Sequence, residues 1–255
     1  LQKDAIGIGA SDTTLPVVPM FHANAWGLAF SGPATGSKLV LPGAKMDGES
    51  IYELLENEKV TFTAAVPTVW LMLLQYLEST NKKLPHLNRV VIGGSAVPER
   101  ILRAFEENYQ VEVVHAWGMT EMSPLGSLGS MTENVLAQDH DTIIKYKLKQ
   151  GRPPFGVEMK TINDEGELLP RDGKTAGRLV VRGPAVAKGY FKNAGGNILD
   201  GEGFFDTGDV ANIDEHGYMQ ITDRAKDVIK SGGEWISSID IENFAVGHPA
   251  VANAA

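Results

Sequence analysis

An alternation of helix-like and strand-like segments between residues 51 and 117 places the strongest constraint on the fold. Ile51, Leu54 and Leu55 keep the spacing of one helical face, and the apolar segment VTFTAAVP (60–67) that follows is typical of a short buried strand. The same order then repeats twice along the chain. Strands that alternate with helices at this pace predict an α/β fold with a parallel sheet and right-handed crossovers.

The two repeats carry recognisable helix signals. Thr68 is expected to cap a helix that places Trp70 in the core, and the strand RVVIGG (89–94) follows it. Pro98 suits the first position of the next helix, because its fixed φ is compatible with helix and its missing N–H would have no partner there. The segment VEVVHAW (111–117) then supplies another strand.

Two turns with glycine follow predicted strands: GGSAVP (93–98) and AWGMTE (116–121). In parallel sheets, ligands collect at the carboxyl ends of the strands, where both turns fall. The second turn places a large aromatic residue, a hydroxyl and a carboxylate within five positions, in Trp117, Thr120 and Glu121. One explanation of this pattern is an ordinary strand end with its aromatic ring in the core and its polar residues in water. A pocket for a flat ring, a phosphate and a metal ion would explain it more fully.

After about residue 148 the chain changes to short β-type runs separated by polar turns. These runs predict a small antiparallel barrel or sandwich. The stretch 132–151 before them is expected to be an irregular or helical connection, and a helix with a buried face is expected after Asp227. The change of pattern therefore divides the chain into an α/β subdomain (1–147), a β-barrel-like subdomain (148–225) and the beginning of a third region (226–255).

Composition excludes several functional classes. The 255 residues carry a formal charge of -9 and no block of Lys and Arg, which argues against a nucleic-acid partner. The chain has no cysteine, so disulfides and thiolate chemistry are excluded and a cytoplasmic location is expected. No apolar run is long enough to predict a membrane span. The first and last residues are expected to be cuts through a longer protein.

Several apparent motifs fail on inspection. GIGASD (7–12) lacks the third glycine of a dinucleotide fingerprint and predicts a plain turn. DGKTAG (172–177) lacks the first glycine of a phosphate loop. QDHDT (138–142) could hold a metal ion but is more typical of a solvated acidic loop. GGSAV (93–97) lacks the second glycine of a hydrolase nucleophile turn.

Other motifs, in this order along the chain, resemble those of the adenylate-forming superfamily. They are PMFHANAWG (19–27), HAWGMTEMSPLG (115–126), GFFDTGD (203–209) and DRAKDVIKSGGEWIS (223–237). Within that superfamily they look most like medium- and long-chain fatty-acyl-CoA ligases and methylmercaptopropionate-CoA ligases. The resemblance covers essentially the whole chain, and it implies that residues 1–147 are an N-terminally incomplete part of a larger domain and that residues 226–255 are a hinge and the start of an α+β domain. It implies activation of a fatty or related carboxylic acid with ATP and Mg²⁺ to acyl-AMP, followed by transfer to coenzyme A.

The resemblance also implies roles for particular residues. Trp117 would stack on adenine, Thr120 would meet the α-phosphate, and Glu121 would bind Mg²⁺. The rest of the implied nucleotide site is formed by Gly93, Gly94, Ser95, His115, Ala116, Gly118, Met119, Asp209, Arg224, Lys230 and Trp235. Asp209 would accept hydrogen bonds from the ribose, although a turn residue would also suit DTGD. Taken as bare residues, Trp117 could also be a core aromatic, and Lys226 and Lys230 could also be solvated charges.

The acyl group and coenzyme A have implied sites of their own. His22, Trp26 and Gly94 would line the acyl pocket, whereas an aromatic cluster after a buried strand is more often core. Lys226 would be the hinge of the domain rotation, and Gly232, Gly233 and Trp235 would approach the pantetheine of coenzyme A.

Two elements of the superfamily's pattern are missing: an upstream Ser/Thr/Gly-rich phosphate loop and a downstream catalytic lysine. The chain alone is therefore expected to be greatly impaired in adenylation. Two alternatives stay open, an adenylating enzyme that serves a carrier protein and a nucleotide-binding module without catalysis. Acid chain length is not readable from the motifs, and peripheral membrane contact and a homodimer of the parent protein are compatible with the sequence.

Overall fold

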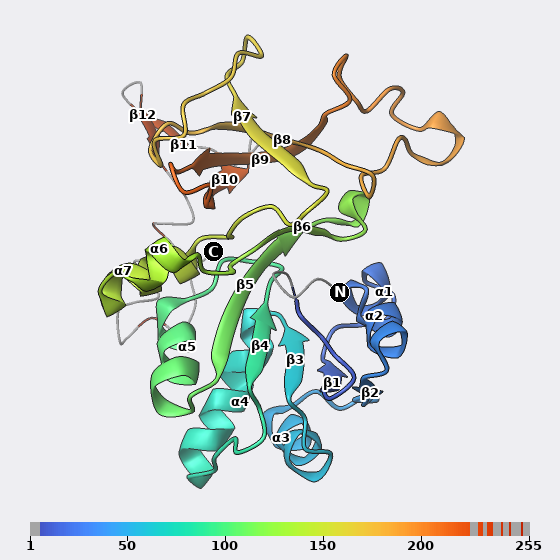
Figure 1. Ribbon diagram of the computed structural model, residues 1–255, viewed down its shortest axis with the longest axis vertical. Coiled ribbons are helices and arrows are strands. Elements are labelled where there is room, and N and C mark those ends of the chain that lie inside the picture. Colours follow the sequence, from blue (N-terminus) through green and yellow to red (C-terminus); the bar gives the residue numbers. More distant parts are fainter. Residues whose placement is uncertain are drawn as a thin grey trace. The chain divides into compact units, whose positions relative to one another are not determined.

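The computed structural model describes residues 6–224, the backbone of residues 229–231 and 234–236, and the single positions 241, 245 and 251 (Figure 1). The chain divides into two compact units, residues 1–154 and 155–255, and each is described by itself. The proposed hinge Lys226 and the glycines Gly232 and Gly233 lie outside the described residues.

The first unit is built on a six-stranded sheet in the order β2-β1-β3-β4-β5-β6. The first five strands in this order pair in parallel, and β6 is antiparallel to β5. The parallel α/β arrangement expected from the alternating pattern is therefore confirmed. The strands are β1 (Thr13–Pro16), β2 (Lys38–Leu39), β3 (Phe62–Ala65), β4 (Arg89–Ile92), β5 (Glu112–Gly118) and β6 (Leu125–Leu128).

Helices cover both faces of this sheet. Strand residues such as Val90, Ile92 and Val113 point to one face, where they pack with side chains of α3, α4, α5 and α7. Alternate residues such as Val91 and Val114 point to the other face, toward Leu28 of α2. The helices are α1 (Ala23–Trp26), α2 (Leu28–Thr35), α3 (Gly48–Asn57), α4 (Pro67–Thr80), α5 (Glu99–Arg103), α6 (Glu133–Leu136) and α7 (His140–Leu148).

The helix starts differ slightly from the sequence expectations. Thr68 does not cap α4, because Pro67 is already its first residue and Val66 is the N-cap. Pro98 is the N-cap of α5 and lies one position before the helix. The helix α3 begins at Gly48, and its N-cap Asp47 accepts the backbone N–H of Ser50 through its carboxylate. Trp70 is completely buried, as its position on a packing helix predicts.

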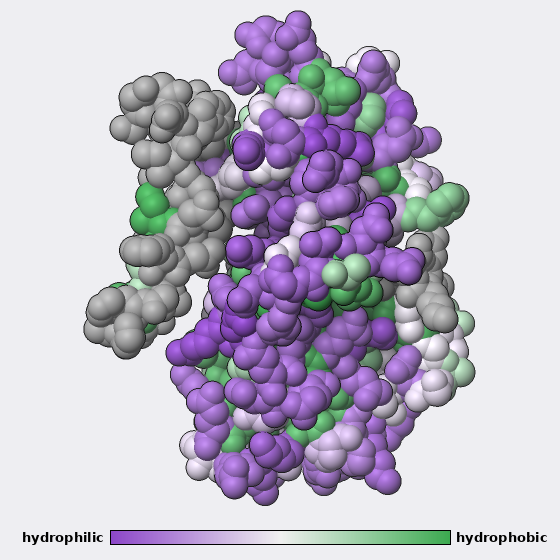
Figure 2. Space-filling view, turned by 60° about the vertical axis from the view of Figure 1, so that its left-hand side comes forward, coloured by the Kyte–Doolittle hydropathy of each residue, from purple (hydrophilic) through white to green (hydrophobic). Residues whose placement is uncertain are grey.

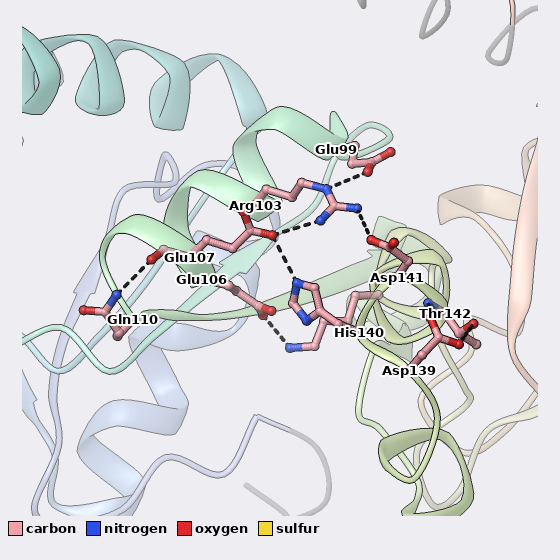
Figure 3. A network of polar contacts seen from close by, with 10 residues as sticks. Glu99, Arg103, Glu106, Glu107, Gln110, Asp139, His140, Asp141 and Thr142 are labelled. Carbon is pink, nitrogen blue, oxygen red and sulfur yellow. Dashed lines mark hydrogen bonds and ion pairs between the residues drawn. The ribbon is translucent and has the colours of Figure 1, made fainter.

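The stretch 132–151 is mainly helical. The QDHDT segment is not a metal-binding loop: Asp139 caps α7 through the backbone N–H of Thr142, and His140 lies 3.1 Å from Glu107. A short π-helix (Ala104–Asn108) continues α5 and carries Glu107. Arg103 bonds to Glu99, Glu107 and Asp141, so that charged side chains join α5 and the π-helix to α7 (Figure 3).

The second unit contains an antiparallel sheet in the order β10-β9-β8-β7. The expected small antiparallel element is thus present, as an open sheet in the described part of the chain. The long strand β9 was not predicted, since its residues include the turn-like DTGD. The elements are β7 (Glu158–Ile162), β8 (Gly177–Arg182), β9 (Phe205–Ile213), β10 (Met219–Arg224) and the hairpin of β11 (Ile229–Ser231) and β12 (Glu234–Ile236).

The discarded phosphate-loop candidate DGKTAG is a turn, as expected. The Asp172 carboxylate accepts the backbone N–H groups of Lys174 and Thr175, and these bonds lower the pKa of Asp172 to about 2. The surface in Figure 2 is mostly hydrophilic, with hydrophobic residues in small separate groups. Among the described residues, no helix combines the length and apolar character that a membrane span requires.

Candidate active site

A pocket lies in the first unit at the carboxyl ends of its parallel strands. It encloses about 570 Å³ of space, part of it open to solvent. The strands β4 and β5 each lead directly into it, and the segment after β1 forms another wall. The lining residues are Ile6, His22, Ala23, Trp26, Val91, Gly93, Gly94, Ala116, Trp117, Gly118, Met119, Thr120, Pro124 and Leu125.

The glycine pair after β4 forms the wall on which the Trp26 indole lies. A Cβ at Gly93 would be 2.9 Å from the carbonyl oxygen of Ala116 and 3.4 Å from Trp26 Cη2. Gly94 has a φ of +84°, which L side chains rarely adopt, and its Cβ would be 3.1 Å from Val66. Glycine is thus required here both for backbone shape and for the close approach of the ring.

Trp26 reaches the pocket from a strained segment. Ala23, Asn24, Ala25 and Trp26 have φ values of 45°, 54°, 53° and 54°, so this short turn is left-handed. A left-handed helical conformation costs roughly 1–2 kcal/mol per non-glycine residue. The turn is closed by the bond from the Gly27 N–H to the carbonyl oxygen of Ala23 at 3.0 Å. Such strain concentrates at functional sites.

The opposite wall comes from the hairpin of β5 and β6. Trp117 is half-buried at the end of β5, and the Met119 N–H donates to the carbonyl of Pro124 at 2.9 Å, which closes the hairpin. Thr120 begins the 3₁₀ turn Thr120–Met122 and lines the pocket with an exposed side chain. An aromatic ring and a hydroxyl therefore face the same space as Trp26.

Three predicted residues of this region do not line the pocket. Glu121 follows Thr120 directly and is half-buried, and Ser95 is exposed beyond the glycine pair. His115 is completely buried, with Nδ1 2.9 Å from the carbonyl oxygen of Leu148. Burial lowers the pKa of His115 to about 4, against the opposing effect of backbone carbonyl groups. Its imidazole is therefore neutral at physiological pH, and its hydrogen bond to Leu148 stabilises the fold.

The remaining predicted residues belong to the second unit. Asp209 lies in β9 with its Cα opposite that of Arg224 in β10, so it is a strand residue and its turn alternative is wrong. Lys230 and Trp235 are opposite one another in the β11–β12 hairpin.

Sequence reasoning missed several lining residues, among them Ile6, Ala23, Val91, Pro124 and Leu125. Ala23 lies inside the recognised segment PMFHANAWG, so its neighbours His22 and Trp26 were the available signal. Pro124 and Leu125 come to the pocket because β6 folds back on β5, and that strand was not predicted.

One carboxylate, that of Glu121, lies next to the pocket at this turn. Among the described residues, no group of three His, Cys, Asp or Glu side chains could hold a metal ion. Mg²⁺ commonly takes only one or two protein carboxylates together with substrate phosphates. Glu121, one residue after the pocket-lining Thr120, can supply one such carboxylate.

Comparison with known families agrees with this geometry. The family of AMP-binding enzymes matches residues 2–191, which include all the lining residues of the pocket. The chain belongs to the AMP-binding enzyme family.

Three relatives that match almost the whole chain are named as CoA ligases. The chain is 48% identical over 252 residues to a medium-chain-fatty-acid–CoA ligase of Ectopseudomonas oleovorans, covering 99% of this chain and 46% of the relative. It is 47% identical over 253 residues to a 3-methylmercaptopropionyl-CoA ligase of Ruegeria pomeroyi, covering 99% and 47%. A long-chain-fatty-acid–CoA ligase of Thermus thermophilus is 45% identical over 254 residues, with 99% and 47% covered. The chain thus spans about half the length of these relatives.

Solved AMP-binding structures share the fold. The O-succinylbenzoate coenzyme A synthetase of Bacillus subtilis in complex with AMP has a TM-score of 0.81 and 27% identity, covering 97% of this chain and 48% of that one. The same enzyme with ATP and magnesium has a TM-score of 0.81 and 27% identity, covering 97% and 49%. The predicted resemblance and fold class are therefore confirmed.

Proposed function

We propose that this chain forms the acyl- and nucleotide-binding part of an acyl-CoA ligase that consumes ATP and releases AMP. Its substrate would be a fatty or related carboxylic acid, and its acceptor coenzyme A. The observation that carries the proposal is one pocket in which the turn Trp117–Thr120, the glycine pair Gly93–Gly94 and the Trp26 ring meet. The names of the three CoA ligases to which the chain is similar support the same reaction.

The chemistry requires two steps because a carboxylate is a poor electrophile. In the first, a carboxylate oxygen attacks the α-phosphorus of ATP and pyrophosphate leaves. In the second, the thiol sulfur attacks the acyl carbonyl, the thiol loses its proton, and AMP leaves. The thioester bond thus replaces the mixed anhydride bond.

The pocket residues have matching roles in this proposal. Trp117 stacks on the adenine ring. Stacking of a base on an aromatic side chain contributes roughly 1–3 kcal/mol to binding. The Thr120 hydroxyl donates a hydrogen bond to an oxygen of the α-phosphate. Glu121 holds Mg²⁺, which when bound offsets the negative charge of the phosphates. The Trp26 and His22 rings, whose centroids are 6.4 Å apart in an edge-to-face arrangement, border the acyl group.

Residues of the second unit have proposed roles toward the nucleotide and coenzyme A. Asp209 would accept hydrogen bonds from the ribose hydroxyls, with Arg224 as a second contact from the neighbouring strand. Lys226 would act as the hinge for rotation of the following domain. The hairpin with Lys230 and Trp235, and the glycines Gly232 and Gly233, would then approach the nucleotide and the pantetheine. We place the reaction in the cytoplasm, where ATP and coenzyme A are available.

The test is made on a protein of the relatives' length that carries this sequence. Acid-dependent exchange of labelled pyrophosphate into ATP, followed by acyl-CoA formation with free coenzyme A, is the expected result. Exchange without acyl-CoA formation would favour an enzyme that serves a carrier protein. ATP binding without exchange would favour a nucleotide-binding module and would overturn the proposal.

The 255-residue chain permits a second measurement. A non-hydrolysable acyl-AMP analogue should bind to it in calorimetry, and Trp117→Leu should weaken that binding. Exchange activity of this chain alone is expected to be greatly reduced, because the resemblance implies a phosphate loop and a lysine that it does not contain. Gly201→Ala is the matched control and should bind the analogue as the wild type does, because a Cβ added at that exposed turn has no atom within 4 Å.

A further inference from the structure

The connection between β8 and β9 presents two exposed aromatic side chains. Figure 1 shows it as a long loop that leaves the sheet of the second unit. Phe191 is 84% exposed and Tyr190 is 44% exposed, although aromatic rings usually bury most of their surface in a folded domain. Both residues belong to the segment GPAVAKGYFKNAGGNIL (183–199). This loop therefore holds apolar surface outside the core.

A closed turn presents the two rings. The backbone N–H of Asn193 donates to the carbonyl oxygen of Tyr190 at 3.0 Å, and that of Ala194 donates to the carbonyl oxygen of Phe191 at 3.2 Å. Lys192 and Asn193 have φ values of 54° and 57°, a left-handed conformation that turns the chain directly after Phe191. The turn is thus closed by its own backbone and leaves the aromatic side chains exposed.

The same loop is basic in an acidic chain. The chain carries 32 Asp and Glu residues against 23 Lys and Arg, and its formal charge is -9. Residues 183–199 contain Lys188 and Lys192 and no acidic residue. Both lysines are exposed, and within the described part of the chain neither forms an ion pair. Lys192 Nζ lies 5.6 Å from the centroid of the Phe191 ring, so a cation and an apolar ring are adjacent.

The turn between β7 and β8 provides a contrast in the same unit. Its Leu168 is 70% exposed, but Asp164, Glu165 and Glu167 lie beside it in sequence. An anionic surface would repel this turn, because like charges brought together in water raise the free energy. It would attract the loop 183–199. Exposed apolar surface and positive charge coincide in the loop and not in the turn.

We infer that the loop 183–199 binds the surface of a membrane that contains anionic lipids. The rings enter the boundary between headgroups and acyl chains, and the two ammonium groups meet lipid phosphates, a combination that gives reversible binding without a membrane span. A specific protein interface buries about 800 Å² on each partner around a shaped apolar core, which two rings on an open turn do not supply. A lipid surface accepts an inserted ring without matching its shape. The inference goes beyond the proposed function and does not depend on it.

Vesicle co-sedimentation tests this inference on a protein of the relatives' length, in the absence of acid, ATP and coenzyme A. The vesicles contain phosphatidylcholine alone or an equal mixture with phosphatidylglycerol. The wild type should bind the mixed vesicles at least 10-fold more tightly, and raising the salt to about 200 mM should weaken that binding. The double variant Lys188→Gln/Lys192→Gln should lose at least 10-fold, because each lysine near an anionic surface contributes about 5-fold.

Matched variants separate the loop from general effects of charge and apolar surface. Phe191→Ser should weaken binding to the mixed vesicles at least 3-fold, whereas Leu168→Ser removes an equally exposed apolar side chain and should not. The double variant Lys82→Gln/Lys83→Gln makes the same change of net charge at exposed positions of the first unit and should bind as the wild type does. Circular dichroism checks that all variants fold.

Fluorescence gives a second readout that locates the inserted side chain. Lipids with brominated acyl chains should quench the indole added in Phe191→Trp, and they should not quench the one added in Leu168→Trp. Equal binding to neutral and mixed vesicles, wild-type binding by the loop variants, or no vesicle binding at all would overturn the inference. A dimer that dissociates in Phe191→Ser, measured by sedimentation velocity, would also overturn it and assign the loop to a contact between copies. Pyrophosphate exchange is measured separately and decides only about the proposed function.

Discussion

His115 donates a hydrogen bond from Nδ1 to the carbonyl oxygen of Leu148 at 2.9 Å and so joins β5 to the last turn of α7. The neighbouring strand is fastened to the same connection, because the Ser127 hydroxyl donates to the carbonyl of Gln150 at 2.6 Å. Leu128 and Arg152 exchange backbone hydrogen bonds of 2.8 and 2.9 Å. The hairpin that carries Trp117 is thus held by the chain that follows α7.

Buried His115 should make stability depend on pH. Burial lowers its pKa from 6.5 to about 4 in the folded protein, whereas the unfolded chain keeps the ordinary value. Between pH 6.5 and 4 the unfolded state therefore binds a proton that the folded state does not, and stability falls as the pH falls. At 1.36 kcal/mol per pKa unit, this loss reaches about 3 kcal/mol at pH 4 and vanishes above pH 6.5. Urea unfolding between pH 7.5 and 4.5 measures it.

The variant His115→Asn isolates this effect, because asparagine can donate a similar hydrogen bond but does not titrate. It should be less stable than the wild type at pH 7.5 and should lose less stability on acidification. Ser127→Ala is the control, since it removes a neighbouring buried hydrogen bond without removing a titratable group. It should keep the wild-type pH slope. Identical slopes in His115→Asn and the wild type would show that the imidazole is protonated in the folded state.

The ion pairs of α7 differ in burial, and we expect the buried pair to contribute more to the free energy of unfolding than the exposed ones. Lys147 pairs with Glu106, whose Oε1 also accepts the N–H of Val113 at 3.0 Å, and the two charged side chains are only 12% and 16% exposed. Lys147→Met would leave a buried carboxylate without its cation, which costs about 3 kcal/mol in comparable pairs. Chemical unfolding at neutral pH should show this loss.

The cluster around Arg103 provides the contrast. Arg103 makes three ion pairs, but its partners Glu99 and Asp141 are 52% and 73% exposed (Figure 3). Exposed pairs contribute little because water and salt screen them. Arg103→Met should therefore change the unfolding midpoint much less than Lys147→Met. A larger effect of Arg103→Met would mean that the number of ion pairs matters more than their burial.

The left-handed turn Ala23–Trp26 predicts an unusual response to glycine. Glycine normally destabilises a helix. At position 23, however, it would remove the Cβ that makes a φ of 45° unfavourable. Ala23→Gly should therefore raise the free energy of unfolding by about 0.5–1 kcal/mol. Ala29→Gly in the ordinary helix α2 is the matched control and should lower it by roughly 1 kcal/mol. Thermal or urea unfolding of both variants checks the opposite signs; the same sign in both would show that the turn carries no strain.

The sequence predicted those parts of the site that depend on local pattern. Apolar runs and helix signals were sufficient for the parallel sheet, and parallel strands necessarily bring their carboxyl ends to one edge. For this reason Gly93, Gly94, Trp117 and Thr120 were expected near one another, and they do share a pocket. The resemblance added His22 and Trp26, which lie far from these residues in sequence.

Features that depend on pairing between strands were not predictable. Gly126 looks like an ordinary small residue until β6 folds back on β5 and sets its position against the Trp117 ring. Asp209 has turn-like neighbours, yet its pairing with Arg224 of β10 keeps it in a strand. The left-handed turn before α2 has no sequence signature either, because three of its four residues disfavour that conformation. In each case tertiary contacts override local preference.

The metal role of Glu121 gives the most direct test of the nucleotide site. Glu121→Ala in a protein of the relatives' length should reduce Mg-dependent pyrophosphate exchange at least 100-fold, because it removes the proposed carboxylate ligand beside the phosphates. Folding should be retained, since the side chain is half-buried and lies in a short surface turn. Glu133→Ala, an acidic residue in the first turn of α6, is the matched control and should leave exchange unchanged. Raising the Mg²⁺ concentration should partly restore exchange in Glu121→Ala. A wild-type rate in this variant would exclude the carboxylate as a metal ligand. If added Mg²⁺ does not restore exchange and circular dichroism shows an unfolded protein, the role of Glu121 is to stabilise the fold of the turn.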